Sequence, residues 1–474
     1  MATENYLLEL DATGQKQLLD QKLITSLELV DFYIDRIEKL NPKLNAVIHQ
    51  MFDNARDMAK NIPLHASPVA GLPFLIKDLN PVKGEPSTSG SVMLKDFIAP
   101  ANDYIVNRWK EAGLIFLGKT NTPEMGFLPT TEPVLFGPTK NPWDLDRSPG
   151  GSSGGAAAAV AAGLIPFAHA SDGGGSIRIP ASACGLFGFK PSRGRLPYSP
   201  YVNHFSVNHA LTRSVRDSAI LLDILNGCEH PQIYPAFDKQ TNFFSSLKKT
   251  SQKLRIAVGY ETNAMVKYDK ATRDNFTRTV QLMKDLGHDV VDISPSFDHE
   301  AMAHHFINIW MATGSVVIKH LGQMAGKEPT PPNVEKLTYE MLKYGEKLSA
   351  LEYEESRVFL QREAQKIMEF FCEFDVWMTP TMNQLPLKIG EREGLELSGY
   401  EGMMQNMLDY NPLMPIANAT GQPAMSVPAH WTEAGLPVGI HFFGQLGKDA
   451  SMLQLAHQIE NAQPWFHHYK QTHI

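Results

Sequence analysis

The sequence predicts an α/β protein in which helices flank a central sheet. Short apolar runs with strand character alternate with helical segments up to about residue 230. The alternation weakens into polar, proline-containing sequence between about 226 and 253 and resumes at residue 254. This weaker stretch could be a long connection or a domain border, because a length of 474 residues allows one large domain or up to about three small ones.

The first predicted element is an amphipathic surface helix from Thr25 to Leu40. Apolar residues recur there every three or four positions, and Thr25 with Glu28 makes a capping-box pattern. Because proline blocks the continuation of a helix, we expect this one to end at Asn41, before Pro42.

The later elements keep the same rhythm. Strands are predicted at 71–78, at the end of 112–118, and at 166–170, 254–259 and 289–293. Helices are predicted at 156–164, where alanine dominates, and at 271–286. The stretch 298–374 is predicted to be largely helical.

Composition excludes several classes of protein. Acidic residues outnumber basic ones by 51 to 43, so no nucleic-acid partner is expected. A content of 43% hydrophobic and 20% charged residues is typical of a folded globular protein. Cys184, Cys228 and Cys372 match neither a disulfide framework nor a zinc site, and we expect no metal and no cofactor. The first residues show neither an export signal nor a membrane span, which predicts a cytoplasmic protein with no membrane partner.

Two Gly/Ser clusters, at 148–155 and 171–176, are the most unusual part of the sequence. A flexible linker is the ordinary interpretation of such composition. These clusters instead lie between strand-like and helix-like segments, which favours backbone held in unusual conformations near serine hydroxyls. A phosphate-binding loop is disfavoured because Gly155 is followed by Ala156 instead of lysine, and no dinucleotide-binding glycine pattern opens a helix.

Two local serine motifs are also disfavoured. Residues 150–154 match the G-x-S-x-G elbow, with Ser152 as its serine, but that elbow must follow a strand and here follows a turn-rich polar stretch. Residues 245–248 match S-x-x-K but lie in a polar region that we expect to be exposed.

Several motifs together closely resemble the amidase signature family. They are Gly150-Gly-Ser-Ser-Gly-Gly155, Asp172-Gly-Gly-Gly-Ser-Ile-Arg-Ile-Pro180 and Cys184-Gly-Leu-Phe-Gly-Phe-Lys-Pro191, with the lysine-bearing run 71–78 upstream and 418–428 and 435–440 downstream. The resemblance covers nearly the whole chain. It implies a single α/β/α domain over 1–474 with a mixed, twisted sheet, a catalytic core at about 70–200 and a variable helical region at about 298–374.

The resemblance also implies a Ser-Ser-Lys triad that hydrolyses amides through an acyl-enzyme. Matched residue by residue, Ser176 is the nucleophile, Ser152 the bridging proton relay and Lys77 the general base. The resemblance further implies a cis peptide bond between Gly151 and Ser152. The oxyanion hole would be formed by the backbone amides of Gly173, Gly174 and Gly175.

Elementary chemistry supports this assignment. A serine hydroxyl needs a base, and Lys77 serves as one only when it is neutral. Neutrality near pH 7.5 requires a pKa far below the ordinary value of about 10.4, at a cost of about 4 kcal/mol that burial among apolar neighbours supplies. Many members of the family have threonine at the position of Gly173, and that difference leaves the backbone amides in place.

Some nearby residues are predicted to be structural. Arg178 is expected to pair with a buried acid such as Asp172, while His169 and Cys184 are expected in the core. Three residues fall where the family lines its substrate pocket, although they could equally belong to the core: Met125, Gly126 and Phe127.

Two kinds of amidase remain open. Residues 118–126 resemble free-standing amidases, and across the chain the similarity is to the branch that contains 6-aminohexanoate-cyclic-dimer hydrolases. The alternative is the glutaminase subunit of a tRNA-dependent amidotransferase. A non-enzymatic binding protein is disfavoured because all three triad positions are present. We expect a small-molecule amide substrate and a monomer or homodimer, with the pocket shaped by 298–374 and by the loop after Pro380.

Overall fold

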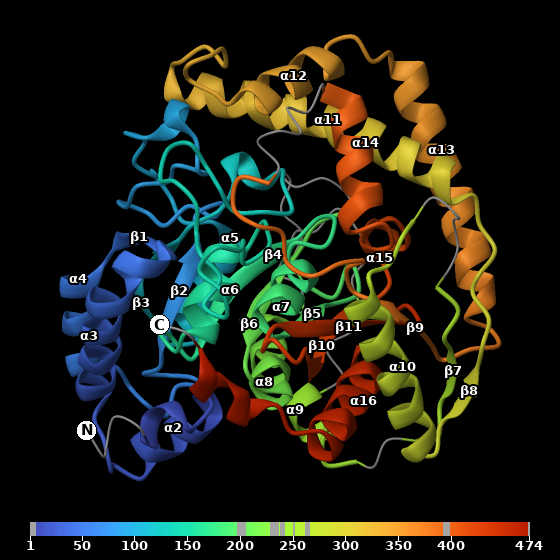
Figure 1. The fold of residues 1–474 in the computed structure, drawn as a ribbon. Helices are drawn as coiled ribbons and strands as arrows, with labels where there is room; N and C mark the ends of the chain where they lie inside the picture. Colours follow the sequence, from blue (N-terminus) through green and yellow to red (C-terminus); the bar gives the residue numbers. More distant parts are fainter. Residues whose placement is uncertain are drawn as a thin grey trace.

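A mixed sheet of eleven strands runs through the centre of the molecule (Figure 1). The computed structural model describes residues 6–196, 205–227, 237, 242–249, 252–260, 266–391 and 399–472. In spatial order, the strands are β1 (Val47–Gln50), β3 (Ile115–Thr120), β2 (Pro73–Lys77), β4 (Phe167–Asp172), β6 (Val207–Thr212), β5 (Phe187–Lys190), β10 (Ala424–Trp431), β11 (Pro437–Gly444), β9 (Val376–Pro380), β7 (Arg255–Ala257) and β8 (Asp289–Val291).

The sheet combines parallel and antiparallel pairs. Strand β2 is parallel to β3 and β4, and β7 is parallel to β8 and β9. The other neighbouring strands, including the central run β4-β6-β5-β10-β11, are antiparallel. The predicted α/β fold with a mixed sheet is therefore confirmed.

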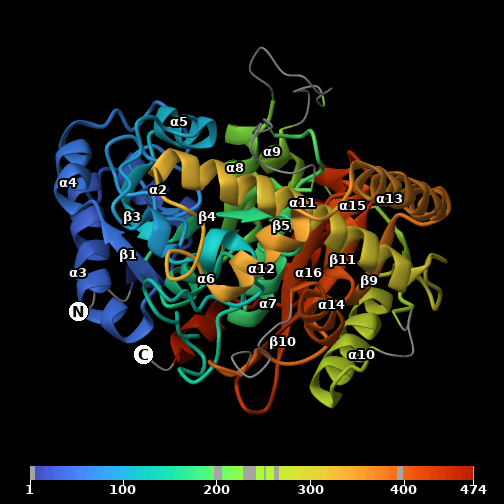
Figure 2. The ribbon, with the colours of Figure 1, turned by 90° about the horizontal axis from the view of Figure 1, so that it is seen from above.

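Helices flank the sheet. They are α2 (Ala12–Asp20), α3 (Ser26–Leu44), α4 (Phe52–Asn61), α5 (Tyr104–Glu111), α6 (Gly154–Ala161), α7 (Arg178–Cys184), α8 (Val215–Leu225), α9 (Phe243–Ser246), α10 (Lys270–Asp285), α11 (His299–Ala325), α12 (Lys336–Gly345), α13 (Ala350–Phe370), α14 (Gly399–Tyr410), α15 (Met414–Thr420) and α16 (Asp449–Ala462). Helices α12, α13 and α14 all contact α11 and gather with it at one end of the molecule (Figure 1). Seen from above, α11 crosses over the middle of the sheet (Figure 2).

The observed elements agree with most of the predicted ones. Each predicted strand corresponds to an observed strand, namely β2, β3, β4, β7 or β8, and the predicted helices correspond to α3, α6 and α10. The stretch 298–374 is largely helical, as predicted, and forms α11, α12 and α13. Much of the weaker stretch 226–253 lies outside the described residues. In its described part, Ser245 and Lys248 are exposed, which confirms that the S-x-x-K motif is solvated.

The predicted end of the first helix is wrong. Helix α3 begins with the predicted capping box of Thr25 and Glu28 but continues through Pro42 to Leu44. Pro42 lies in the last turn, and the helix closes where Asn45 adopts a left-handed conformation and donates its amide to the carbonyl of Asn41. A proline this close to the end of a helix interrupts little of the hydrogen-bond ladder, so the helix tolerates it.

Helix α6 explains why small residues follow the first Gly/Ser cluster. All eight of its residues are buried. A Cβ at Gly154 would lie 2.3 Å from the Thr131 hydroxyl, and one at Gly155 would lie 2.4 Å from the backbone nitrogen of Asn121. Only glycine permits this close approach at 154 and 155, and the helix thereby places the preceding serines deep inside the molecule.

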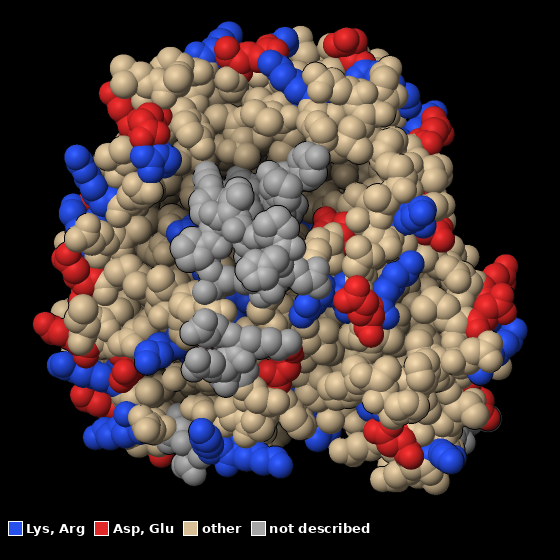
Figure 3. All heavy atoms as spheres, turned by 180° about the vertical axis from the view of Figure 1, so that it is seen from behind, with Lys and Arg blue, Asp and Glu red and all other residues tan. Residues whose placement is uncertain are grey.

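Charges of both signs are interspersed on the surface. The face opposite to that of Figure 1 shows Lys and Arg side chains next to Asp and Glu side chains around its edge (Figure 3). Among the described residues, no helix has the length and apolar character needed to cross a membrane.

Candidate active site

Lys77 is the last residue of strand β2 and lies deep inside the molecule. All five residues of the strand are buried, and Lys77 has no solvent-exposed surface. Its side-chain nitrogen Nζ donates hydrogen bonds to three serine hydroxyls: Oγ of Ser152 at 2.7 Å, of Ser153 at 2.9 Å and of Ser171 at 3.2 Å. The structure therefore brings the predicted pair Lys77 and Ser152 into direct contact.

Burial changes the acidity of this amine. It lowers the pKa of Lys77 from its usual 10.5 to about 7, although the negative charge of Asp172 opposes the change. Near neutral pH a substantial fraction of Lys77 is therefore unprotonated and able to accept a proton.

Ser152 connects this amine to the wall of a cavity. The peptide bond between Gly151 and Ser152 is cis, as predicted. A Cβ placed on Gly126 would lie 3.3 Å from the Ser152 hydroxyl, and Gly126 itself lines the cavity. The hydroxyl of Ser152 therefore lies immediately behind this part of the cavity wall.

The second Gly/Ser cluster is held in place by Asp172 at the end of β4. Its carboxylate accepts hydrogen bonds from Nε and Nη2 of Arg178, both at 2.9 Å. Both side chains are fully buried, and the Arg178 guanidinium helps to hold the pKa of Asp172 well below its usual range, against the effect of burial. The predicted pairing of Arg178 with Asp172 is confirmed.

The same carboxylate organises the backbone before the predicted nucleophile. Asp172 accepts the amide of Gly175 at 2.8 Å, so this amide does not face the cavity as an oxyanion donor, in contrast to the prediction. The other three amides of the cluster make no hydrogen bond to any described residue and stay available: those of Gly173, Gly174 and Ser176.

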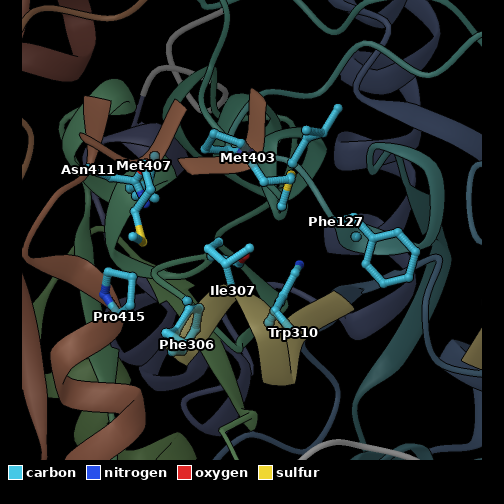
Figure 4. Close-up of a pocket in the computed structure, with 14 residues that line it drawn as sticks. Phe127, Phe306, Ile307, Trp310, Met403, Met407, Asn411 and Pro415 are labelled. Carbon is cyan, nitrogen blue, oxygen red and sulfur yellow. The ribbon is translucent and has the colours of Figure 1, made fainter. Parts of the chain in front are cut away.

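Ser176 opens onto a cavity with mostly apolar walls (Figure 4). The space between protein atoms at this site is about 500 Å³, its open mouth included. Gly126 and Phe127 line it as predicted, whereas Met125 packs in the hydrophobic core and does not. None of the described residues that line it is charged.

The structure records no direct hydrogen bond between the two serines of the predicted triad. Within the described residues, Ser152 is bonded to Lys77, while Ser176 makes no side-chain hydrogen bond at all. Ser152 lies behind the cavity wall at Gly126, and Ser176 lines the same cavity.

The sequence analysis did not name the individual residues that helix α11 and the segment around α14 contribute to the cavity wall. Helix α11 contributes Phe306, Ile307 and Trp310, which confirms that the 298–374 region shapes the pocket. The segment around α14 contributes Met403, Met407 and Asn411. Their only signal in the sequence is apolar periodicity, which does not distinguish a cavity wall from ordinary core.

The remaining predictions concern residues outside the site. His169 is fully buried, with its ring bonded to Asn208 at 3.1 Å, and burial lowers its pKa to about 3. Cys184 is also fully buried. Both are core residues, as predicted.

The chain is similar to known proteins over nearly its whole length. A family model described as Amidase matches residues 28–453. A 6-aminohexanoate-cyclic-dimer hydrolase from Pseudomonas sp. (strain NK87) is 34% identical over 96% of this chain and 95% of its own length. A solved structure of a 6-aminohexanoate cyclic dimer hydrolase matches with a TM-score of 0.91 and 32% identity over 97% of this chain and 98% of its own. One subunit of the glutamyl-tRNA(Gln) amidotransferase from Thermotoga maritima is more distant, with a TM-score of 0.75 and 27% identity over 93% of this chain and 92% of its own. The chain therefore belongs to the amidase family, as its resemblance to the amidase signature predicted.

Proposed function

We propose that this enzyme hydrolyses the C–N bond of an uncharged carboxylic amide through an acyl-enzyme on Ser176. The observation that carries the proposal is the hydrogen bond of 2.7 Å between the buried amine of Lys77 and the hydroxyl of Ser152, beside a cavity onto which Ser176 opens. A titratable amine bonded to one serine, with a second serine on the wall of the cavity, would supply base, relay and nucleophile without any histidine.

In the acylation half-reaction Ser176 is the nucleophile, and Ser152 and Lys77 carry the proton first away from Ser176 and then to the departing nitrogen. Ser176 Oγ attacks the carbonyl carbon of the amide and gives its proton to Ser152 Oγ, which passes its own proton to the neutral amine of Lys77. The tetrahedral intermediate then collapses as the C–N bond breaks. The proton returns through Ser152 to the departing nitrogen, which leaves as an amine, and the acyl group stays on Ser176 as an ester.

Deacylation repeats the same proton transfers with water in place of Ser176. The base removes a proton from water as it attacks the ester, and the carboxylic acid leaves when Ser176 recovers its proton. In both steps the negative charge on the carbonyl oxygen would be stabilised by the three available amides, those of Gly173, Gly174 and Ser176.

The cavity wall favours an uncharged substrate over glutamine. Free glutamine carries an ammonium and a carboxylate, and burying either without an opposite charge is costly. The described residues that line the cavity supply no such charge. The names of the relatives include a cyclic amide of 6-aminohexanoate, and we extend that class, a largely aliphatic amide, to this enzyme. A cytoplasmic location and a monomeric or homodimeric state stay predictions of the sequence.

A panel of amides tests the proposal. The purified chain alone would be incubated with aliphatic amides, aryl amides, cyclic and linear 6-aminohexanoate amides and glutamine, with Ser176→Ala as the control for contaminating activity. We expect release of amine from the uncharged amides and little from glutamine. If only glutamine were turned over, and only weakly, the amidotransferase glutaminase would be the better assignment.

A further inference from the structure

Two aromatic side chains of α11 lie directly against the loop that precedes Ser176. A Cβ built on Gly173 would lie 3.0 Å from Cζ3 and 3.1 Å from Cη2 of Trp310. One built on Gly174 would lie 3.5 Å from Cζ of Phe306. Both aromatic residues also line the cavity onto which Ser176 opens. The space to which the Cβ atoms of the two glycines would point is therefore already bordered by rings.

Three rings together form what we call the aromatic wall, made of Phe306, Trp310 and Phe127. The rings of Trp310 and Phe306 stack with centres 5.8 Å apart and planes at 19°. Phe127 meets the Trp310 ring edge-on, with centres 6.3 Å apart and planes at 78°. A Cβ at Gly314, one turn further along α11, would lie 3.4 Å from the tip of the Phe127 ring. Figure 4 shows the three rings in a row along one side of the cavity, so a group that needs more room there must displace more than one ring.

The proposed reaction determines which part of the substrate meets the aromatic wall. The departing nitrogen receives its proton from Ser152, which lies behind the cavity wall at Gly126. The carbonyl oxygen is expected at the available amides of Gly173, Gly174 and Ser176. The first carbon of the acyl chain is bonded to the same carbonyl carbon, on the side away from the nitrogen. It is therefore the acyl chain, and not the amine, that lies beside the rings.

We propose that the aromatic wall, with Trp310 at its centre, limits the width of the acyl chain next to the carbonyl and so selects amides whose first acyl carbon is unbranched. A methyl branch on this carbon would have to enter space that the rings occupy, and close-packed side chains resist such intrusion. A straight chain avoids the rings and extends along the other apolar walls. The inference rests on the proposed amidase function and assigns Trp310 to its acyl specificity.

Two isomeric substrates test this assignment. The butanoyl and isobutanoyl amides of one chromophoric amine have the same composition and the same leaving group, and they differ only in the branch next to the carbonyl. The measured quantity is the ratio of kcat/KM for the straight isomer to that for the branched isomer, divided by the ratio of their rates of alkaline hydrolysis. We expect this corrected ratio to be about tenfold or more in wild type, the usual effect of one methyl group in an apolar site.

Two substitutions should move the corrected ratio in opposite directions. Trp310→Leu shortens the middle of the wall and should lower the ratio about tenfold. Gly173→Ala adds a Cβ 3.0 Å from the Trp310 ring and 2.6 Å from the Ser206 hydroxyl, which can rotate away. The displaced ring narrows the cavity, so the ratio should rise, while any damage to the backbone amide affects both isomers equally and cancels. The double variant should return to the ratio of Trp310→Leu, because no large ring is left to be displaced.

The amine side of the substrate supplies a control. Butanoyl amides of n-butylamine and sec-butylamine differ in a branch next to the nitrogen, and Trp310→Leu should leave the ratio of their kcat/KM values unchanged. Val316→Ala is the control variant, because Val316 lies on α11 and is 67% exposed. Melting temperature reports folding of every variant.

The assignment is overturned if the corrected ratio of wild type is close to one, or if Trp310→Leu lowers both acyl isomers equally. A change in the amine pair instead of the acyl pair also overturns it, because the wall would then face the leaving group. In each of these cases hydrolysis of the straight isomer still upholds the proposed function. If wild type hydrolyses no isomer but is labelled by a fluorophosphonate, labelling rates of probes with n-butyl or sec-butyl on phosphorus give the same comparison. If it is neither active nor labelled, the proposed function fails together with the assignment.

Discussion

The amine of Lys77 lies 2.7 Å from the hydroxyl oxygen of Ser152, and both groups are shielded from solvent. A protonated lysine in this position would be a buried cation that only the more distant Asp172 helps to balance. Burial instead favours the neutral amine, and the neutral amine is a base. Exclusion of solvent from Lys77 therefore destabilises the fold when the amine is protonated. The same exclusion lowers the pKa of the amine, so that it can act as a base near neutral pH.

Substitution of Lys77 is expected to remove most of the turnover. Lys77→Ala should lower kcat by about a hundredfold or more, because no base remains to accept the serine proton. Lys77→Arg should be almost as damaging, because a guanidinium stays protonated and cannot act as the base. Turnover of wild type should rise as the pH passes about 7, where the amine loses its proton, and neither variant should show that rise. Steady-state rates from pH 5 to 9 are the measurement.

Melting temperature controls for misfolding of these variants. If Lys77 were only a structural cation that holds the serines, Lys77→Arg would keep the charge and part of the activity. A well-folded Lys77→Arg enzyme with near-normal turnover would show that Lys77 is not the base.

The free energy of unfolding should depend on pH, because the fold lowers the pKa of Lys77. Between pH 7 and 10.5 the unfolded chain holds this proton and the folded chain does not, so the free energy of unfolding of wild type gains a contribution that rises with pH. The destabilisation caused by burying protonated Lys77 is complete below about pH 7 and absent above 10.5. Lys77→Met lacks it. Its unfolding free energy relative to wild type should therefore fall by about 5 kcal/mol across this window.

Urea denaturation at several pH values measures this difference. The hydrogen bonds to serine that Lys77→Met also loses contribute a constant offset, which the slope with pH does not contain. A difference that stays flat from pH 7 to 10.5 would mean that the folded-state pKa is close to its ordinary value.

The three serines near the site should respond differently to substitution. Ser176→Ala should abolish covalent labelling by a fluorophosphonate, because the attacking oxygen is gone. Ser152→Ala should keep some labelling while turnover falls about a hundredfold. Ser153→Ala is the matched control, because Ser153 also accepts from Lys77, at 2.9 Å, but its hydroxyl donates to the carbonyl of Ser171. Its loss should be tenfold or less.

Intact-mass spectrometry of the labelled proteins gives the answer directly. Labelling of Ser176→Ala together with no labelling of Ser152→Ala would exchange the two roles. An equal loss of turnover in Ser152→Ala and Ser153→Ala would remove the basis for assigning the relay to one of them.

Replacement of Asp172 tests whether the loop before Ser176 depends on its buried carboxylate. Asp172→Asn leaves the Arg178 guanidinium as an uncompensated buried charge, so the free energy of unfolding should fall by about 3–5 kcal/mol. The double variant Asp172→Asn, Arg178→Met removes both charges and should recover part of this loss. Denaturation midpoints of the three proteins give the comparison. No recovery in the double variant would mean that the backbone amides, rather than the charge pair, dominate the contribution of Asp172.

The sequence by itself determined the elements and the identity of the chemical groups. Strand β2 with its terminal lysine, the Ala-rich helix α6 and the pairing of Arg178 with Asp172 were all predictable. These features depend on short runs of residues whose periodicity, size and charge act locally. The resemblance of the motifs to the amidase signature family also implied that Lys77 and Ser152 act together.

Tertiary structure decided what these groups face. The amide of Gly175 is occupied because Asp172 folds back on its own loop, and Met125 turns into the core while Gly126 and Phe127 face the cavity. The cavity walls come from segments far apart in the chain, with Phe127 on one side and Trp310 and Asn411 on others. Apolar periodicity identifies the buried side of a helix but not the segment that packs against it, and so the shape and polarity of the cavity follow only from long-range packing.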